Sequence, residues 1–227
     1  TAGPCSVNSN QAITIVADED ATYTYSSTTE CQSGTDMTAT ITGTAGGTFT
    51  ATPAGLTLNS TTGLIDVSTS TANTYDVTYT TSGSCPANLI ISVTINADED
   101  ASFTLSSANE CQSGTDVTAT ITGTTGGAFT AAPAGLNINS ATGDIDVSAS
   151  TSGPYTVTYT TIGACSANSN QAITIVADED ATYSYSSTTE CQSGADMTAT
   201  ITGTAGGTFT STPAGLTINA GSGLIDV

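Results

Sequence analysis

Three short runs of acidic residues are the groups in this sequence whose types and spacing could support chemistry. Each run reads Asp-Glu-Asp, and the runs recur at intervals of 80 residues. Carboxylate oxygens are ligands that Ca²⁺ prefers, so each run could hold a calcium ion, with carbonyls and water completing its coordination. The alternative is a solvated acidic linker, whose charges keep neighbouring sheet edges from associating. The candidate metal ligands are Asp18, Glu19, Asp20, Asp98, Glu99, Asp100, Asp178, Glu179 and Asp180.

No basic side chain balances these acids. The 227 residues include 20 Asp and Glu but no Lys, Arg or His, so the net charge at pH 7 is −20. No lysine can form a Schiff base, and no histidine can act as a general base or bind a metal. The surface has no cations to displace the counterions of nucleic acid, and an anionic membrane repels it. We therefore expect no nucleic-acid partner and, because no apolar run approaches ~18 residues, no direct membrane insertion of this segment.

Internal repetition organises the whole chain. Residues 17–67 and 177–227 differ at seven of 51 positions, and a period this regular decides the domain organisation. We expect a window from a longer array. The predicted domains are the C-terminal part of a preceding repeat (1–16), two whole immunoglobulin-like repeats (17–96 and 97–176), and the N-terminal part of a further repeat (177–227). The last three are called the first, second and third copies below.

Within a copy, apolar side chains alternate with polar ones, which is the period of a half-buried strand. In residues 74–81, for example, Tyr75, Val77 and Tyr79 would face one way and the residues between them the other. Turns rich in Gly, Pro and Asn separate such runs, and no segment has a helical stripe. Roughly seven strands per copy predict an all-β fold, a tandem array of immunoglobulin-like β-sandwiches of about 80 residues that form an elongated rod.

Six cysteines in a chain without histidine indicate disulfides formed in an oxidising compartment. Two sets of pairs follow the period, one inside a copy and one across the acidic runs. An acidic run in an extended conformation would hold the second set far beyond the ~7 Å between Cα atoms that a disulfide allows, so we favour pairing inside a copy, with the partners of Cys5 and Cys191 outside the sequence. The favoured pairs are Cys31–Cys85 and Cys111–Cys165; the others are Cys5–Cys31, Cys85–Cys111 and Cys165–Cys191.

The stretch PAGLTLNSTTGLIDVSTSTANTYDVTYTT at 53–81 carries a family resemblance. It resembles the cadherin-like, immunoglobulin-like repeats of bacterial surface proteins, in which P-A-G-L is followed by T-G-x-I and then by G-x-Y-x-V. The second copy matches this pattern more fully, because Asn73 stands in the first copy where the second has Gly153. The whole 80-residue copy is similar to the tandem repeats of very large adhesins of gliding Bacteroidota, which the type IX secretion system exports. The resemblance implies a β-sandwich at the extracellular cell surface, and it carries over no catalytic residue.

The favoured function is structural: a stalk or spacer in a large extracellular adhesin or surface filament, which extends a binding tip from the cell. Its partners would be neighbouring repeats of the same chain and identical chains in a fibre, and no cofactor is required. The alternative is a repeat-borne module that binds glycan or protein. Such a module would need an exposed aromatic side chain beside a groove, such as Tyr25 or Tyr185.

We do not expect an enzyme. Asp144 and Asp146 form a carboxylate pair of the kind that glycosidases use, but leucine replaces Asp144 in the other two copies. Cadherin-type repeats stiffen their joints with calcium, so the resemblance also supports calcium at the acidic runs. Further carboxylates flank the Cys-Gln-Ser-Gly turns and could add ligands, whereas the Asn-bearing acidic motifs of cadherins are absent, so the solvated linker stays open. These further candidates are Glu30, Asp36, Glu110 and Asp116.

Overall fold

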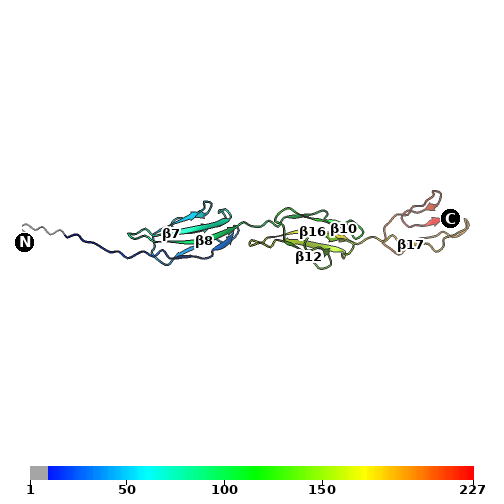
Figure 1. Ribbon diagram of the computed structural model, residues 1–227. Helices are drawn as coiled ribbons and strands as arrows, with labels where there is room; N and C mark the ends of the chain where they lie inside the picture. The colour runs from blue at the N-terminus through cyan, green and yellow to red at the C-terminus, as the bar shows by residue number, and fades with distance from the viewer. Residues whose placement is uncertain (1–9) are drawn as a thin grey trace, which may run out of the picture. The chain divides into compact units, whose positions relative to one another are not determined.

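The computed structural model describes residues 10–227, and these residues form β-strands (Figure 1). None of them forms a helix long and apolar enough to cross a membrane. The first copy has eight strands, against roughly seven expected, and most are short because turn residues interrupt the apolar alternation. They are β1 (Tyr23–Tyr25), β2 (Thr29–Cys31), β3 (Ala39–Ile41), β4 (Thr48–Thr52), β5 (Thr57–Leu58), β6 (Ile65–Asp66), β7 (Asn73–Thr80) and β8 (Asn88–Asn96).

Four of these strands form the larger sheet of the first copy, in the order β2–β8–β7–β4. β7 and β8 are an antiparallel hairpin, and β4 extends the sheet with Phe49 opposite Tyr79. β2 is parallel to β8 and places Cys31 beside Asn96. The end of β2 therefore lies at the C-terminal end of β8, next to the acidic run that follows.

The opposite layer consists of the pairs β1–β3 and β5–β6, joined by a bridge between Met37 and Ile65. The core lies between the two layers, where the ring centroids of Tyr23 and Phe49 are 5.3 Å apart and those of Phe49 and Tyr79 are 4.6 Å apart. The buried side chains alternate along the strands, as the period of two predicts. They are Ala21, Tyr23, Met37, Phe49, Ile65, Val67, Tyr75, Val77, Tyr79, Val93 and Ile95.

The Thr-Gly-x-Ile motif forms the turn between β5 and β6. The side chain of Asn59 accepts hydrogen bonds from the backbone N–H groups two and three residues later, each at 3.0 Å. Gly63 then has a φ of +72°, and a Cβ there would meet the Phe49 ring at 2.7 Å, so the turn requires glycine. The turn delivers Ile65 to the core, where it is fully buried.

The second copy repeats this arrangement. Its larger sheet has the order β10–β16–β15–β12, and β10 is parallel to β16 with Cys111 beside Val176. Its strands are β9 (Phe103–Leu105), β10 (Asn109–Cys111), β11 (Ala119–Ile121), β12 (Ala128–Ala132), β13 (Asn137–Ile138), β14 (Ile145–Asp146), β15 (Gly153–Thr160) and β16 (Asn168–Val176).

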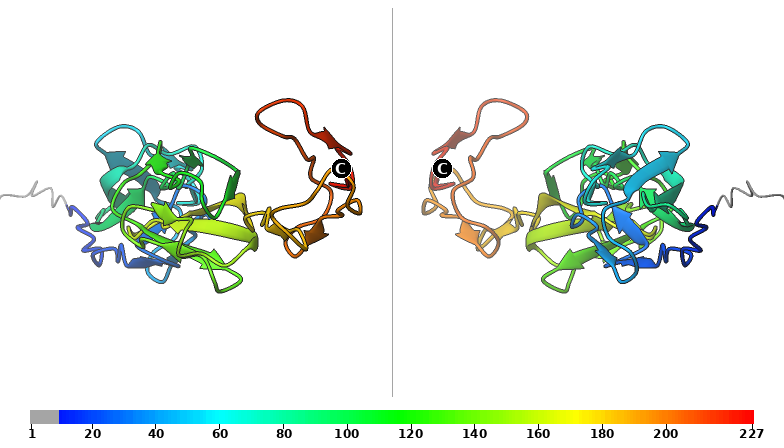
Figure 2. Two further views of the ribbon diagram at one scale, coloured as in Figure 1. Left: turned by 90° about the vertical axis from the view of Figure 1, so that its right-hand side faces the viewer. Right: turned by 90° about the vertical axis from the view of Figure 1, so that its left-hand side faces the viewer.

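The third copy carries short strands joined by long loops, coloured orange and red in Figure 2. The strands pair as β17–β18 and β19–β20. Tyr183 is 51% exposed, whereas its counterpart Tyr23 is 1% exposed. In the first copy Tyr79 of β7 packs against Tyr23, with ring centroids 5.8 Å apart. The strands are β17 (Tyr183–Ser184), β18 (Thr200–Ile201), β19 (Thr217–Ile218) and β20 (Ile225–Asp226).

Contacts divide the chain into two compact units that do not coincide with the copies. The first unit takes the described residues up to Phe103 together with two loop regions of the second copy, and the second unit takes the rest. Those two regions, Ile121–Ala128 and Tyr159–Ser169, contain the loops that contact the acidic run 98–100. The domain boundaries taken from the period, at 17, 97 and 177, stay a prediction.

Candidate functional site

The acidic run 98–100 is the point at which the first and second copies meet. Asp98 accepts two hydrogen bonds from Ser33, in the Cys-Gln-Ser-Gly turn of the first copy, at 3.1 Å from its N–H and 2.8 Å from its hydroxyl. The Glu99 side chain accepts the N–H of Gly163 at 3.1 Å, and the Glu99 N–H donates to the Cys165 carbonyl at 3.2 Å. Adjacent acids therefore hold a turn of one copy and a loop of the next.

Asp100 fixes a further loop. Its N–H donates to the Thr124 hydroxyl at 3.1 Å, and its carbonyl accepts the Thr124 N–H at 2.6 Å. Its carboxylate accepts the Ser102 N–H at 2.9 Å and also the Ser102 hydroxyl. Gly123 permits this approach, because a Cβ there would lie 2.1 Å from the Asp100 carbonyl oxygen. The run is a set of hydrogen-bond acceptors for three separate loops.

Part of this set of contacts recurs at each of the other two runs: the loop contact at residues 18–20 and the turn contact at residues 178–180. Glu19 accepts the Gly83 N–H at 3.1 Å and donates its own N–H to the Cys85 carbonyl at 3.1 Å. Asp178 accepts the Ser113 N–H at 2.9 Å and the Ser113 hydroxyl at 2.8 Å. We call this arrangement of Cys-Gln-Ser-Gly turn, acidic run and cysteine-bearing loop the joint. The complete joint is formed at residues 98–100, and each of its halves recurs with the period of the sequence.

The last carboxylate of each run is held in its ionised form. The pKa of Asp20, Asp100 and Asp180 is lowered from its ordinary value near 3.8, chiefly by the hydrogen bond from the hydroxyl group two residues later. Because the folded pKa is lowered, the ionised carboxylates contribute stability above the unfolded pKa, and this contribution is lost as the pH falls through the folded value. At neutral pH the carboxylates therefore act as acceptors.

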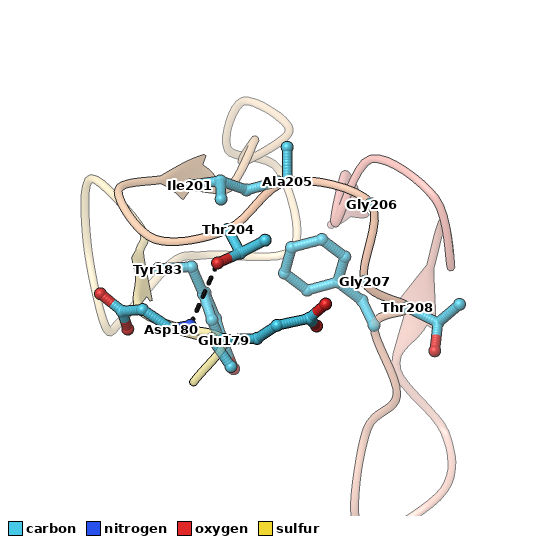
Figure 3. Close-up of a pocket in the computed structure, with 11 residues that line it drawn as sticks. Glu179, Asp180, Tyr183, Ile201, Thr204, Ala205, Gly206, Gly207 and Thr208 are labelled. Atoms are coloured by element: carbon cyan, nitrogen blue, oxygen red, sulfur yellow. Dashed lines mark hydrogen bonds between the residues drawn. The ribbon is translucent and has the colours of Figure 1, made fainter. Parts of the chain in front are cut away.

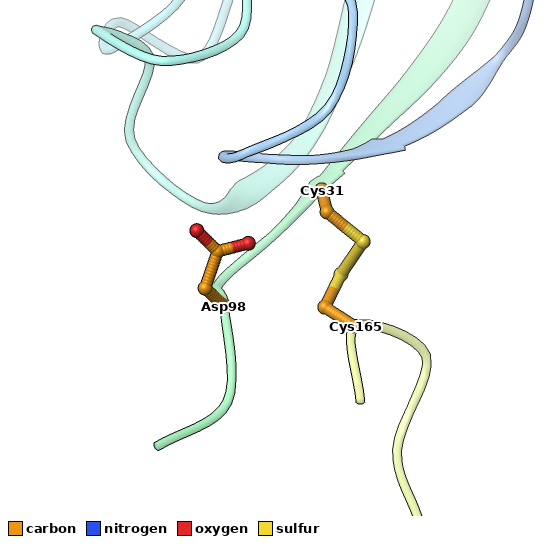
Figure 4. Close-up of side chains that lie close together, drawn as sticks. All are labelled: Cys31, Asp98 and Cys165. Atoms are coloured by element: carbon orange, nitrogen blue, oxygen red, sulfur yellow. A yellow bond between two sulfur atoms is a disulfide. The ribbon is translucent and has the colours of Figure 1, made fainter. Parts of the chain in front are cut away.

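A disulfide joins the first two copies beside the same run. Cys31 is bonded to Cys165, with Cα atoms 5.7 Å apart and a sequence separation of 134 residues. Figure 4 shows Asp98 next to this bond. The joint between these copies is thus covalent as well as hydrogen-bonded.

Both sets of pairs expected from the sequence are therefore wrong, including the favoured Cys31–Cys85 and Cys111–Cys165. Cys31 lies beside Asn96 at the C-terminal end of β8, whereas Cys85 lies in the loop that precedes β8. A nine-residue strand separates its ends by about 30 Å at ~3.3 Å per residue, far more than the ~7 Å between Cα atoms that a disulfide allows. Cys5 lies outside the described residues. The free cysteines among residues 10–227 are Cys85, Cys111 and Cys191.

In this arrangement the carboxylates of an acidic run do not converge on one point. Ca²⁺ needs about six to eight oxygens around one point, but neighbouring carboxylates in a run accept hydrogen bonds from different loops. Among residues 10–227, three side chains bring possible metal-ligand atoms within 4.8 Å of one another: Cys31, Asp98 and Cys165. The two sulfurs are bonded to each other in the disulfide, so they are not available as thiolate ligands. Asp36 and Asp116, expected as further ligands, each accept a backbone N–H after β6 or β14 at 3.2 Å.

Calcium binding at Asp98, Glu99 and Asp100 stays a prediction of the sequence, and it requires these carboxylates to turn towards a common point. It predicts that millimolar calcium raises the melting temperature of the intact chain by more than that of the Asp98→Asn/Asp100→Asn variant, because asparagine keeps one oxygen acceptor and loses the charge. Differential scanning calorimetry measures both. Equal melting temperatures of the intact chain with calcium and with chelator would contradict it.

The hydroxyl groups of Tyr25 and Tyr185 are hydrogen-bonded within their own copies, and Tyr185 also borders a groove of the third copy together with Leu216. Each donates its hydroxyl to a backbone carbonyl, at 2.9 and 2.6 Å, and burial raises the pKa of both, so the hydroxyls stay protonated. The carboxylates of Asp144 and Asp146 are also used locally, since each accepts the hydroxyl of a residue two positions away, at 2.8 and 2.7 Å. These residues stabilise turns and strands of their own copy.

A cavity of about 280 Å³ lies in the third copy, bordered by Tyr183, Gly207 and Phe209 (Figure 3). In the first copy Tyr79 occupies the corresponding place: a Cβ at Gly47 would lie 2.8 Å from the Tyr79 ring, whereas nothing lies within 4 Å of a Cβ at Gly207. The cavity therefore lies at the position that the Tyr79 ring fills in the first copy.

No family model matches the chain, and no curated protein matches it. Among solved structures, it is similar to mouse cadherin-23 EC22–24 at 15% identity over 91% of this chain and 88% of that chain, with a TM-score of 0.36. It is also similar to human CDH23 EC21–23 (12% identity, 88% and 88%, TM-score 0.37) and to protocadherin gamma B2 domains 3–6 (9%, 92% and 67%, TM-score 0.37). The chain is thus similar in structure to cadherin extracellular domains, at low TM-scores. Its all-β sandwich fold follows from the strand pairing described above.

Proposed function

We propose that the chain is a stalk or spacer segment of a large extracellular adhesin or surface filament, which extends a binding tip from the cell. The observation that carries this proposal is the joint, whose contacts recur with the period of the sequence. A joint whose two halves recur with matching hydrogen bonds supports a function that depends on length and on the regular connection of one copy to the next, as in other repeat proteins. Distinct binding sites would require copies that differ more.

The cellular setting is part of the proposal. A disulfide between copies is typical of proteins from oxidising compartments, and the sequence resemblance points to adhesins of gliding Bacteroidota exported by the type IX secretion system. The partners would be neighbouring repeats of the same chain and identical chains in a fibre. A net charge of −20 supports a solvated surface that resists collapse onto neighbouring chains.

The alternative, a repeat-borne module for glycan or protein, has less support. The two tyrosines that would mark its site direct their hydroxyls to backbone carbonyls. The strongly exposed aromatic among the described residues, Tyr183, borders the unfilled core of the third copy.

Small-angle scattering tests the stalk through the length of the particle. A sandwich strand plus its loops gives each copy a length of about 40 Å, so the chain should exceed about 100 Å in its largest dimension. Insertion of a duplicate of residues 97–176 after Val176 should increase that dimension by about 40 Å, because each copy adds at its joint. An increase of only a few ångströms, as for a globule that grows in volume, would contradict the proposal.

A further inference from the structure

The turn that carries Cys111 has the same structure as the turn that carries Cys31. In both turns, the residue after the cysteine donates its N–H to the last residue of β8 or β16 at 3.0 Å, and the serine that follows binds the first Asp of the next acidic run. Cys31 is bonded, whereas Cys111 is exposed and free. Two identical turns therefore differ in whether a cysteine-bearing loop reaches them.

The loop that carries Cys85 likewise corresponds to the loop that carries Cys165. The carbonyl of each cysteine accepts the N–H of the Glu in the preceding acidic run, at 3.1 Å from Glu19 and 3.2 Å from Glu99. The glycine two residues before each cysteine donates to that same Glu side chain at 3.1 Å. In space, the cysteine-bearing loop of each of the first two copies therefore lies beside the acidic run that begins the copy. The cysteine-bearing turn lies beside the acidic run that follows the copy.

We propose that Cys31–Cys165 is one member of a periodic series of disulfides, in which the turn cysteine of each copy bonds the loop cysteine of the next. In this series Cys111 would form a disulfide with the loop cysteine of a following copy. Cys85 would form a disulfide with the turn cysteine of a preceding copy. Each bond forms when two thiols lose two protons and two electrons by exchange with a disulfide oxidant, whose own S–S bond is reduced to two thiols.

In such a series the disulfides would bear a pulling force, so that the sandwiches between them would not be extended. This mechanical property goes beyond a spacer role and does not depend on it. Force applied at the chain ends passes from Cys31 through the bond to Cys165, so the 134 residues of separation cannot extend. Fully extended, that stretch would measure about 470 Å at ~3.5 Å per residue. In a continuing array, the force would pass along the chain only from the loop cysteine of one bond to the turn cysteine of the next bond. Only these short segments, such as 165–191, could be extended.

Pulling the full chain by its termini tests the existing bond. The contour length of the oxidised chain should be shorter than that of the Cys31→Ser variant by about 470 Å, and reductant should release the same length from the unmodified chain. Cys111→Ser is the matched control, because it alters the corresponding turn of the second copy, whose cysteine is free, and should leave the contour length unchanged. Contour length does not depend on whether a variant folds, so equal lengths for the oxidised chain and Cys31→Ser would overturn the proposal.

A second experiment tests the series. A copy of residues 148–176 appended after Val227 supplies a further loop cysteine, equivalent to Cys165 and one period beyond it. After oxidation with a glutathione disulfide buffer, peptide mapping should find Cys111 bonded to the appended counterpart of Cys165. A chain in which Cys31–Cys165 has formed but Cys111 still reacts with an alkylating agent would overturn the periodic series.

Discussion

Reduction of the Cys31–Cys165 bond should lower the stability of the first two copies more than any other single change. The bond closes a ring with a separation of 134 residues, and the unfolded-chain entropy that such a ring removes corresponds to about 3–5 kcal/mol. For a region of this size, the melting temperature should fall on the order of 10 °C. Scanning calorimetry with and without reductant measures the change, and the third copy, which lies outside the ring, should be unaffected.

Two variants make this result specific. Cys31→Ser should unfold at the temperature of the reduced chain, and reductant should have no further effect on it. Cys111→Ser removes a free thiol from the same kind of turn and should leave the melting temperature unchanged. A Cys31→Ser variant that still loses about 10 °C on reduction would show that another bond stabilises the chain.

Replacement of Gly47 by alanine should destabilise the first copy by roughly 3 kcal/mol, through overpacking of a site that cannot relax. The new Cβ would lie 2.2 Å from the carbonyl oxygen of Thr80 and 2.8 Å from the ring of Tyr79. Moving the backbone away would break the pairing of β4 with β7 and the 2.9 Å hydrogen bond from the Gly47 N–H to the Tyr79 hydroxyl. Urea titration of the intact chain measures the loss.

The chain supplies a matched control for this change. Gly207 stands at the same position in the third copy, where nothing lies within 4 Å of an added Cβ. Gly207→Ala should therefore leave the unfolding curve unchanged. Equal destabilisation by the two substitutions would mean that helix or strand propensity, and not the contact with β7, limits this position.

The core could be predicted from the sequence because burial follows a local rule. Tyr75, Val77 and Tyr79 occupy alternate positions of one strand, and all three are fully buried. Ile41 and Leu56 are apolar as well, but they are only partly buried beside the core. Alternation identifies the inward face of a strand, but the depth of each residue depends on what covers that strand.

The joint could be predicted only in part. The acidic runs were identified, but their partners Ser33 and Gly163 lie 65 and 64 residues away from Asp98 and Glu99. Carboxylates that accept these bonds resemble, in sequence, carboxylates that bind calcium or stay solvated. The repeated Gly123 position was the available signal, because a glycine within a Thr-rich stretch can mark the close approach of another backbone segment.

The cysteine pairing was missed for a topological reason. A bond from Cys31 to the loop cysteine of the next copy satisfies the 80-residue period as well as the expected pairs do. Choosing it requires knowing that β2 runs parallel to β8, which puts Cys31 at the end of the copy and Cys85 at its start. Strand direction in a sheet is set by tertiary packing, and the alternation of side chains does not report it.

Peptide mapping of the unreduced chain tests the covalent joint most directly. The thiols are alkylated in the folded protein, and pepsin then cleaves it at acid pH, where thiolate exchange is suppressed; trypsin has no site because the chain lacks Lys and Arg. The expected result is a linked pair of peptides containing Cys31 and Cys165, with the alkyl group on Cys111. A linked pair containing Cys31 and Cys85, or an alkylated Cys31, would contradict a disulfide that joins one copy to the next.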